Sequence, residues 1–182
     1  MRKLFINDKD FKNLKLKIYC IDSEGNGIAY SSDNKIDNIK FLIPGTLKDE
    51  IILAKPIKNV KEGIYCELLQ IISPSNLRVK EDCSQFLKCG GCDFRHVSNN
   101  WIQSWKINQL KQKTKLLVNP NKIFPIAISN NHSRRRATFS AAYHNKKLFL
   151  GFKSKFSTNI VNLDTCKTLE KELIKIYLFF RD

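Results

Sequence analysis

Closely spaced cysteines are the residues of this sequence whose types and spacing point most directly to chemistry. Three of them stand within ten residues, in Cys83-Ser-Gln-Phe-Leu-Lys-Cys89-Gly90-Gly91-Cys92, and Cys166 follows far downstream. The glycine pair permits positive φ and lets backbone N–H groups approach a bound object closely. Four thiolates are the ligands of an iron–sulfur cube. The spacing therefore predicts a metal or cluster site, with Cys166 as the fourth ligand.

Two alternatives to an iron–sulfur cluster remain open on spacing alone. A tetrathiolate zinc site also uses a short Cys-x-x-Cys pair, although it usually combines this with a second such pair, which the sequence lacks. A group of purely structural thiols fits the tight spacing less well. Cys20 and Cys66 lie within strand patterns and are interpreted as small buried hydrophobic residues.

Positive charge is concentrated in the second part of the chain. The 32 Lys and Arg against 17 Asp and Glu give a net charge of +15, of which residues 1–80 carry +4 and residues 81–182 carry +11. Between Cys83 and Thr158 there are 14 basic residues and one acid, Asp93. A solvated basic surface is one reading, but such an excess in one part is typical of a surface that binds a polyanion. We expect nucleic acid and not a membrane, because no basic amphipathic helix of the interfacial type stands out.

The run Arg134-Arg135-Arg136 is the densest basic feature. Guanidinium groups suit phosphate oxygens, so we expect these three side chains to contact RNA phosphates, together with Lys106 and Lys153. Phe139 and Tyr143, in the strand that follows, are expected to lie in the core. The three histidines are scattered and are expected to be surface or loop residues without a catalytic role.

Hydrophobic periodicity and turn signals divide the chain into two expected domains. Residues 1–77 read as five short strands, which suggests a five-stranded OB-type β-barrel; the expected strands cover 16–20, 27–30, 39–43, 50–54 and 64–72. Residues 78–182 are expected to form a small α+β cluster-binding domain, with helices over 101–118 and 169–180, a hairpin of 138–143 with 148–152, and a strand over 160–163. The fold class expected overall is mixed β and α+β.

Targeting signals are not evident in the sequence. No apolar run approaches the roughly 20 residues that cross a bilayer, and the N-terminus lacks the continuous apolar segment of a signal peptide. The expected compartment is the cytoplasm, where cysteines are kept reduced and serve as ligands or free thiols.

Taken together, these motifs resemble the bacterial RNA uracil-5-methyltransferases that modify 23S ribosomal RNA. The cysteine motif with its distant fourth cysteine resembles their cluster motif, and residues 13–77 look like their N-terminal TRAM domain. Further similar segments are Gly25-Asn-Gly-Ile-Ala, Ile43-Pro-Gly, Arg78-Val79, Trp101 with Gln103 and Lys106, Ser133-Arg-Arg-Arg-Ala-Thr-Phe-Ser140, and Gly151-Phe152 with Ile160-Val-Asn-Leu-Asp-Thr-Cys166. The family usually has an aromatic residue in place of Ser133 and a basic one in place of Thr138, which predicts weaker RNA binding by this segment.

The resemblance implies a [4Fe-4S] cluster on Cys83, Cys89, Cys92 and Cys166, and an RNA partner, with ribosomal RNA favoured and transfer RNA as the alternative. In the family, a cysteine nucleophile and S-adenosylmethionine belong to a later doubly wound domain. We find no Gly-rich cofactor turn and no spare cysteine here, so no catalytic residue is expected in this chain. It is expected to be inactive alone and to depend on a methyltransferase domain, which could be a separate chain.

Two other function classes are alternatives to a methyltransferase. A stand-alone RNA-binding module with a structural cluster or zinc needs no further domain. A radical methylthiotransferase also joins a TRAM domain to clusters, but its reactive cluster needs Cys-x3-Cys-x2-Cys, and its TRAM domain lies at the opposite end of the chain. The sequence does not match that pattern.

Overall fold

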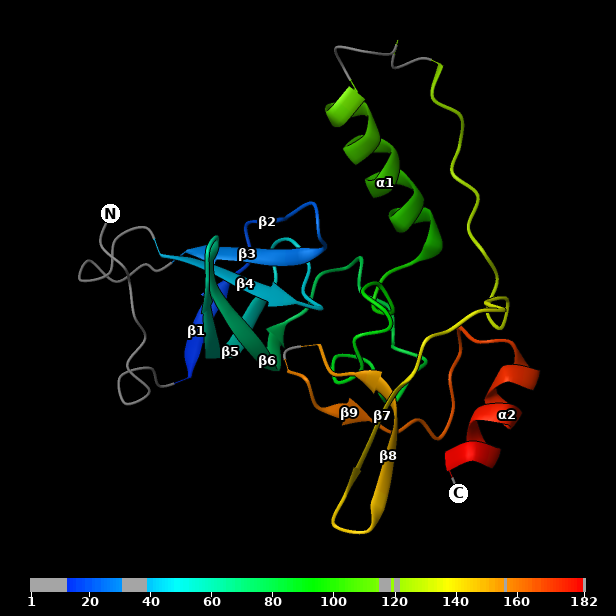
Figure 1. Cartoon of the computed structure of the whole chain (residues 1–182). Helices are drawn as coiled ribbons and strands as arrows, with labels where there is room; N and C mark the ends of the chain where they lie inside the picture. The colour runs from blue at the N-terminus through cyan, green and yellow to red at the C-terminus, as the bar shows by residue number, and fades with distance from the viewer. Residues whose placement is uncertain (1–12, 31–38, 115–118, 120–121, 156, 182) are drawn as a thin grey trace. The chain divides into compact units, whose positions relative to one another are not determined.

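A computed structural model of the chain describes residues 13–30, 39–114, 119, 122–155 and 157–181. The chain forms two compact units, Met1–Arg78 and Val79–Asp182. The first is built from strands and the second mixes helices with strands (Figure 1). Among the described helices, none has the length and apolar character needed to span a bilayer.

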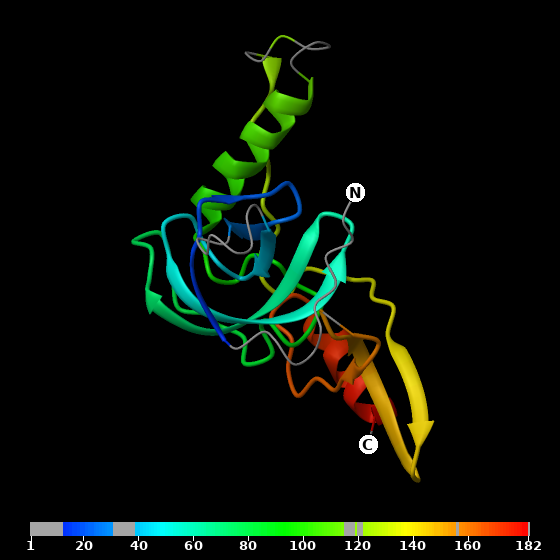
Figure 2. The same cartoon turned by 90° about the vertical axis from the view of Figure 1, so that its left-hand side faces the viewer.

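The first unit is a curled six-stranded sheet (Figure 2). The strand order is β1-β5-β6-β4-β3-β2, and all neighbours are antiparallel except β4 and β6. The strands are β1 (Leu14–Lys17), β2 (Cys20–Ile21), β3 (Asn26–Tyr30), β4 (Lys40–Pro44), β5 (Ile51–Val60) and β6 (Gly63–Ser73). The strand-rich character is confirmed, but the first predicted strand is divided into β1 and β2.

The division of that strand has a visible cause. The N–H of Ile18 donates to the carbonyl of Glu50 at 2.9 Å, whereas the N–H of Tyr19 donates to the carbonyl of Ile28 at 2.8 Å. The chain therefore pairs with β5 up to Ile18 and with β3 from Tyr19 onwards, so that β1 and β2 form the two opposite edges of the sheet. Curling of the sheet brings these two edges to the same stretch of chain.

The core of the first unit lies inside the curl. It consists of side chains that alternate along the strands, among them Leu16, Ile18, Ala29, Ile39, Phe41, Ile43, Ile52, Ala54, Ile64 and Cys66. Cys66 is buried, as predicted, and burial raises the pKa of its thiol to about 12. The corresponding prediction for Cys20 is wrong, because Cys20 is exposed on β2, the outermost strand of the sheet.

A buried ion pair ties the end of the first unit to its sheet. The carboxylate of Glu50, which is fully buried, accepts from Nε and Nη2 of Arg78 at 2.7 and 2.8 Å. It also accepts the N–H groups of Leu47 at 2.8 Å and Ser75 at 3.1 Å. Burial alone would raise the pKa of Glu50, but the hydrogen bonds from Arg78, Ser75 and Leu47 outweigh it and lower the pKa below its usual 4.5.

Glu50→Gln is expected to destabilise the first unit by about 3 kcal/mol, because it leaves a buried guanidinium without its counter-charge. The pKa of Glu50 is lowered in the folded state. Its ionised carboxylate therefore contributes fully to the free energy of unfolding above pH 4.5, and this contribution is lost as the pH falls through the lower pKa of the folded state. Hydrogen exchange of the β1–β6 amides measures this unit separately. Glu62→Gln, the same change at an exposed position, is the control. Equal protection in the two variants would contradict a stabilising ion pair.

Within its described residues, the second unit contains two helices and a three-stranded antiparallel sheet of order β7-β8-β9 (Figure 1). Its elements are α1 (Asn99–Thr114), β7 (Ser140–His144), β8 (Lys147–Lys153), β9 (Ile160–Val161) and α2 (Lys171–Arg181). Each element lies where it was predicted, with ends shifted by a few residues. Residues 115–118 of the predicted first helix lie outside the described residues.

Aromatic packing joins α2 to this sheet. The buried Tyr177 packs its ring against Phe139, with centroids 4.8 Å apart, and Phe139 lies 5.1 Å from Phe152. The Tyr177 hydroxyl donates to the carbonyl of Leu150 at 2.6 Å and accepts the N–H of Leu163 at 2.9 Å. Phe139 thus packs internally as predicted. The same prediction for Tyr143 is wrong, because 73% of this residue is exposed.

Candidate metal centre and nucleic-acid interface

The loop that carries three of the cysteines is held by its backbone. Two turns shape it: the N–H of Phe86 donates to the carbonyl of Cys83 at 3.1 Å, and the N–H of Cys89 donates to the carbonyl of Gln85 at 2.9 Å. The loop then pairs with the end of β8, because Gly90 N–H donates to the carbonyl of Lys153 at 3.0 Å. The sheet therefore fixes the position of the glycine pair and of the cysteines beside it.

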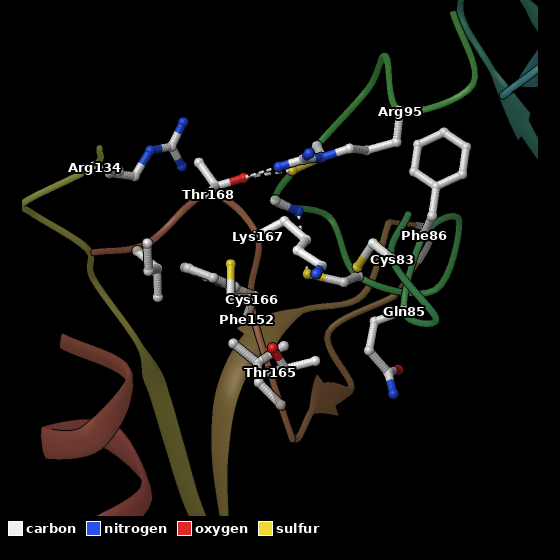
Figure 3. A pocket seen from close by; sticks show the side chains of 15 residues that line it. Cys83, Gln85, Phe86, Arg95, Arg134, Phe152, Thr165, Cys166, Lys167 and Thr168 are labelled. Carbon is white, nitrogen blue, oxygen red and sulfur yellow. Dashed lines mark hydrogen bonds between the residues drawn. The ribbon is translucent and has the colours of Figure 1, made fainter. Parts of the chain in front are cut away.

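All four predicted ligands line one cavity of the second unit. Cys83 and Cys166 enter it from different segments, the cysteine loop and the stretch after β9 (Figure 3). All four thiols are free and half-buried. The rest of the wall is largely apolar and includes Phe86, Phe152, Leu163 and Leu169. Residues that lie up to 83 positions apart in the sequence, from Cys83 to Cys166, are thus brought to one place.

Gly90 is needed for a close backbone approach, and neither glycine of the pair has positive φ. Neither Gly90 nor Gly91 is among the residues with positive φ, so that part of the sequence interpretation is wrong. A Cβ on Gly90 would lie 2.9 Å from the carbonyl oxygen of Lys153. A Cβ on Gly91 would lie 3.4 Å from Sγ of Cys89, and the Gly91 N–H donates to that sulfur at 3.4 Å. The Gly91 N–H is therefore in hydrogen-bonding contact with the thiol of a predicted ligand.

The thiols influence one another electrostatically. Burial raises the pKa of Cys89, and the neighbouring Cys92, Cys166 and Cys83 raise it further, against the lowering effect of the Gly91 N–H. The free thiol is therefore protonated at neutral pH. A metal or cluster that binds here must displace that proton, as thiolate ligation requires.

Arg95 is one of the charged residues that line this cavity, and no motif in the sequence had pointed to it. It donates to Oγ1 of Thr168 at 2.7 Å, and Oγ1 of Thr168 lies 3.3 Å from Sγ of Cys92 (Figure 3). It also contacts Asn131 at 2.9 Å and Asp82 at 3.2 Å. Burial alone would lower the pKa of Arg95, but Cys92 and Asp82 outweigh it and raise the pKa. This guanidinium is placed to balance negative charge on the sulfurs.

The chemistry of these donors suits a soft metal. Thiolates select zinc or iron–sulfur clusters over hard cations such as magnesium. Across the residues that the structure describes, no group of three or more His, Cys, Asp or Glu is arranged to hold a metal ion as it stands. Ligation by the four cysteines therefore remains a prediction.

His96 lies in a loop, which agrees with the prediction of surface or loop positions for the histidines, but it is not at the surface. It is fully buried, and its ring stacks on Phe86 and Phe94 with centroids 5.4 and 6.4 Å apart. Phe94 continues the aromatic cluster to Trp105, at 4.9 Å. His144 is exposed, and His132 is half-buried with Nδ1 3.0 Å from the carbonyl of Leu169.

The three predicted RNA-binding arginines are exposed and line one surface depression. Two backbone hydrogen bonds hold Arg134 in place. Its N–H donates to the carbonyl of Thr168 at 3.1 Å, and its carbonyl accepts the N–H of Glu170 at 3.0 Å. Arg134 also lines the thiol cavity. Lys106 on α1 and Lys153 on β8 are exposed too, but within the described chain neither lines the depression. The arginines are thus brought together, and the two lysines are separate from them.

Known proteins similar to this chain are RNA methyltransferases. The 23S rRNA (uracil(1939)-C(5))-methyltransferase RlmD of Shewanella sediminis is 29% identical over 163 residues, covering 87% of this chain and 36% of that protein. An uncharacterized RNA methyltransferase of Listeria monocytogenes is 30% identical over 161 residues, covering 87% of this chain and 34% of that protein. The resemblance to RNA uracil-5-methyltransferases is confirmed. No protein-family model matches the chain.

A solved structure shares the fold. The Pyrococcus abyssi tRNA (uracil-54, C5)-methyltransferase, in complex with S-adenosyl-L-homocysteine, matches 89% of this chain and 34% of its own, with a TM-score of 0.60 and 21% identity. The chain spans about a third of the length of the curated relatives that it matches. The similarity therefore concerns one part of these enzymes.

Proposed function

We propose that this chain is the RNA-binding and [4Fe-4S]-binding part of an RNA uracil-5-methyltransferase. The observation that carries the proposal is the convergence of Cys83, Cys89, Cys92 and Cys166 on one cavity, in a chain whose relatives are RNA methyltransferases. The cluster, when bound, supplies a rigid anionic cross-link between the cysteine loop and the segment after β9. Arg95 balances its charge, and the Gly91 N–H donates to a ligand sulfur.

The domain boundaries and the methyl donor belong to the same proposal. Residues 1–77 act as an OB-type TRAM barrel, and the curling of the six-stranded sheet supports this assignment. Residues 78–182 act as the cluster and RNA-binding domain. Methyl transfer from S-adenosylmethionine to uridine C5 is the activity that we infer for the whole enzyme, of which this chain is a part. We place it in the cytoplasm, where thiols stay reduced. Ribosomal RNA is the favoured substrate because RlmD of Shewanella sediminis is named for it.

Anaerobic purification followed by metal analysis tests the cluster. We expect a brown protein with about four irons and four sulfides per chain, as a tetrathiolate cube requires. Purification in air should bleach the colour and release iron. A colourless protein with about one zinc per chain would replace the cluster by a tetrathiolate zinc site.

A further inference from the structure

The hairpin β7–β8 is firmly anchored at one end and exposed at the other. At its base, Phe139 packs against both Phe152 and Tyr177. Gly151 lies so close to the carbonyl of Val161 that a Cβ would collide with it. Towards the turn the burial ends, because residues 141–149 are all exposed. Both views show the turn projecting from the rest of the second unit (Figure 1 and Figure 2). We call residues 141–149 the finger.

The finger has a fixed backbone shape. Its strands pair in register from Ser140 with Gly151 to His144 with Lys147, which leaves a two-residue turn. Both turn residues have positive φ, 49° at Asn145 and 61° at Lys146. This is the pattern of a type I′ turn, whose twist matches that of the paired strands. The side chains of the finger are therefore presented in defined directions.

Large apolar side chains are displayed on both faces of the finger. Tyr143 is 73% exposed and lies directly across from Leu148, which is 39% exposed. Phe149 is 38% exposed and pairs with Ala142, so it points to the opposite face. A strand usually buries at least one of its faces, and exposed aromatic side chains mark an interaction surface. The finger is such a surface.

The charge around these rings indicates the kind of partner. His144, Lys146 and Lys147 surround the turn, and the sequence has no acidic residue between Asp93 and Asp164. Aromatic rings beside cations, without carboxylates, match RNA, because unpaired bases stack on the rings while cations attract the phosphates.

We propose that the finger binds an unpaired segment of RNA by stacking a base on Tyr143, with Lys146 and Lys147 at the flanking phosphates. The inference rests on the proposed RNA-binding function and adds the residue that contacts a base. It also predicts a preference for single-stranded over fully paired RNA, because bases in a duplex are already stacked on one another.

Binding of fluorescent RNA by the full chain, loaded with its cluster, tests the finger. The probes are a single-stranded oligonucleotide and the same oligonucleotide paired with its complement. Tyr143→Leu should weaken binding of the single strand about tenfold, and Tyr143→Phe should leave it unchanged because the ring is kept. The salt dependence of binding should be the same in both variants, since stacking neutralises no phosphate. Ultraviolet cross-linking should attach the RNA to the peptide that contains Tyr143.

The possible results of these binding experiments distinguish a failure of the finger proposal from a failure of the proposed RNA-binding function. If the wild type binds neither RNA, the proposed function itself fails. If the wild type binds and Tyr143→Leu binds equally well, the finger is a surface for a protein partner and the inference is overturned. Equal losses in Tyr143→Leu and Tyr143→Phe would also overturn it, because the hydroxyl and not the ring would then be responsible. Leu148→Ala, on the same face but without a ring, should lose less than Tyr143→Leu.

Discussion

Replacing Cys166 by serine is expected to reduce the iron content of the anaerobically purified protein from about four atoms per chain to a small fraction of one. Cys166 enters the cavity from the segment after β9, whereas the other three thiols come from the cysteine loop. A cluster on these four sulfurs therefore links two segments that the sequence separates widely. Serine removes the soft ligand that holds the second segment. Iron and sulfide analysis of the purified variant is the measurement.

The same substitution should lower the stability of the second unit, because the free energy of ligand binding is also free energy of folding. Thermal unfolding followed by the fluorescence of Trp101 and Trp105 reports on this unit, since both tryptophans of the chain lie in it. Cys20→Ser is the matched control, because it makes the same chemical change at an exposed thiol of the first unit. A Cys166→Ser protein that keeps its full iron would exclude Cys166 as a ligand.

The sequence predicted those features that depend on neighbouring residues. The hairpin β7–β8 follows from alternating side chains on both sides of Asn145, a residue type that tolerates the positive φ of a tight turn. The cysteine loop could be predicted because its closely spaced cysteines and glycines are typical of a loop that carries metal or cluster ligands. The split between β1 and β2 was missed because it depends on curling of the sheet, which local alternation does not encode.

The roles of two arginines, one at the candidate centre and one in the first unit, were harder to predict because they come from distant contacts. Arg95 reaches Thr168, 73 positions away, and Arg78 reaches Glu50, 28 positions away. Arg95 does not differ from the other basic residues in its local sequence, and the segment Arg78-Val79 does not reveal the distant partner of Arg78. The exposure of Tyr143 was missed for the opposite reason. An alternating strand predicts one buried face, but the residues on both faces of the finger are exposed.

Replacing Arg134 and Arg136 together by alanine is expected to flatten the salt dependence of RNA binding. The three exposed arginines line one depression, in a chain of net charge +15. For single-stranded RNA the logarithm of the affinity falls with that of the salt concentration by about 0.7 per phosphate neutralised. A site that neutralises about five phosphates has a slope near −3.5, and the double variant should lose about 1.4 of it. Binding titrations at several salt concentrations give the slope directly.

Two further double variants show whether the position of the charge matters or only its amount. Lys171→Ala with Lys175→Ala removes the same charge from exposed positions of α2, and its slope should stay close to that of the wild type. Arg134→Lys with Arg136→Lys keeps the charge and should keep the slope, although lysine lacks the two-pronged geometry of arginine. Because Arg134 also lines the thiol cavity, the iron content of each variant must equal that of the wild type. An unchanged slope in the alanine variant at full iron content would mean that the arginines are solvated and contact no phosphate.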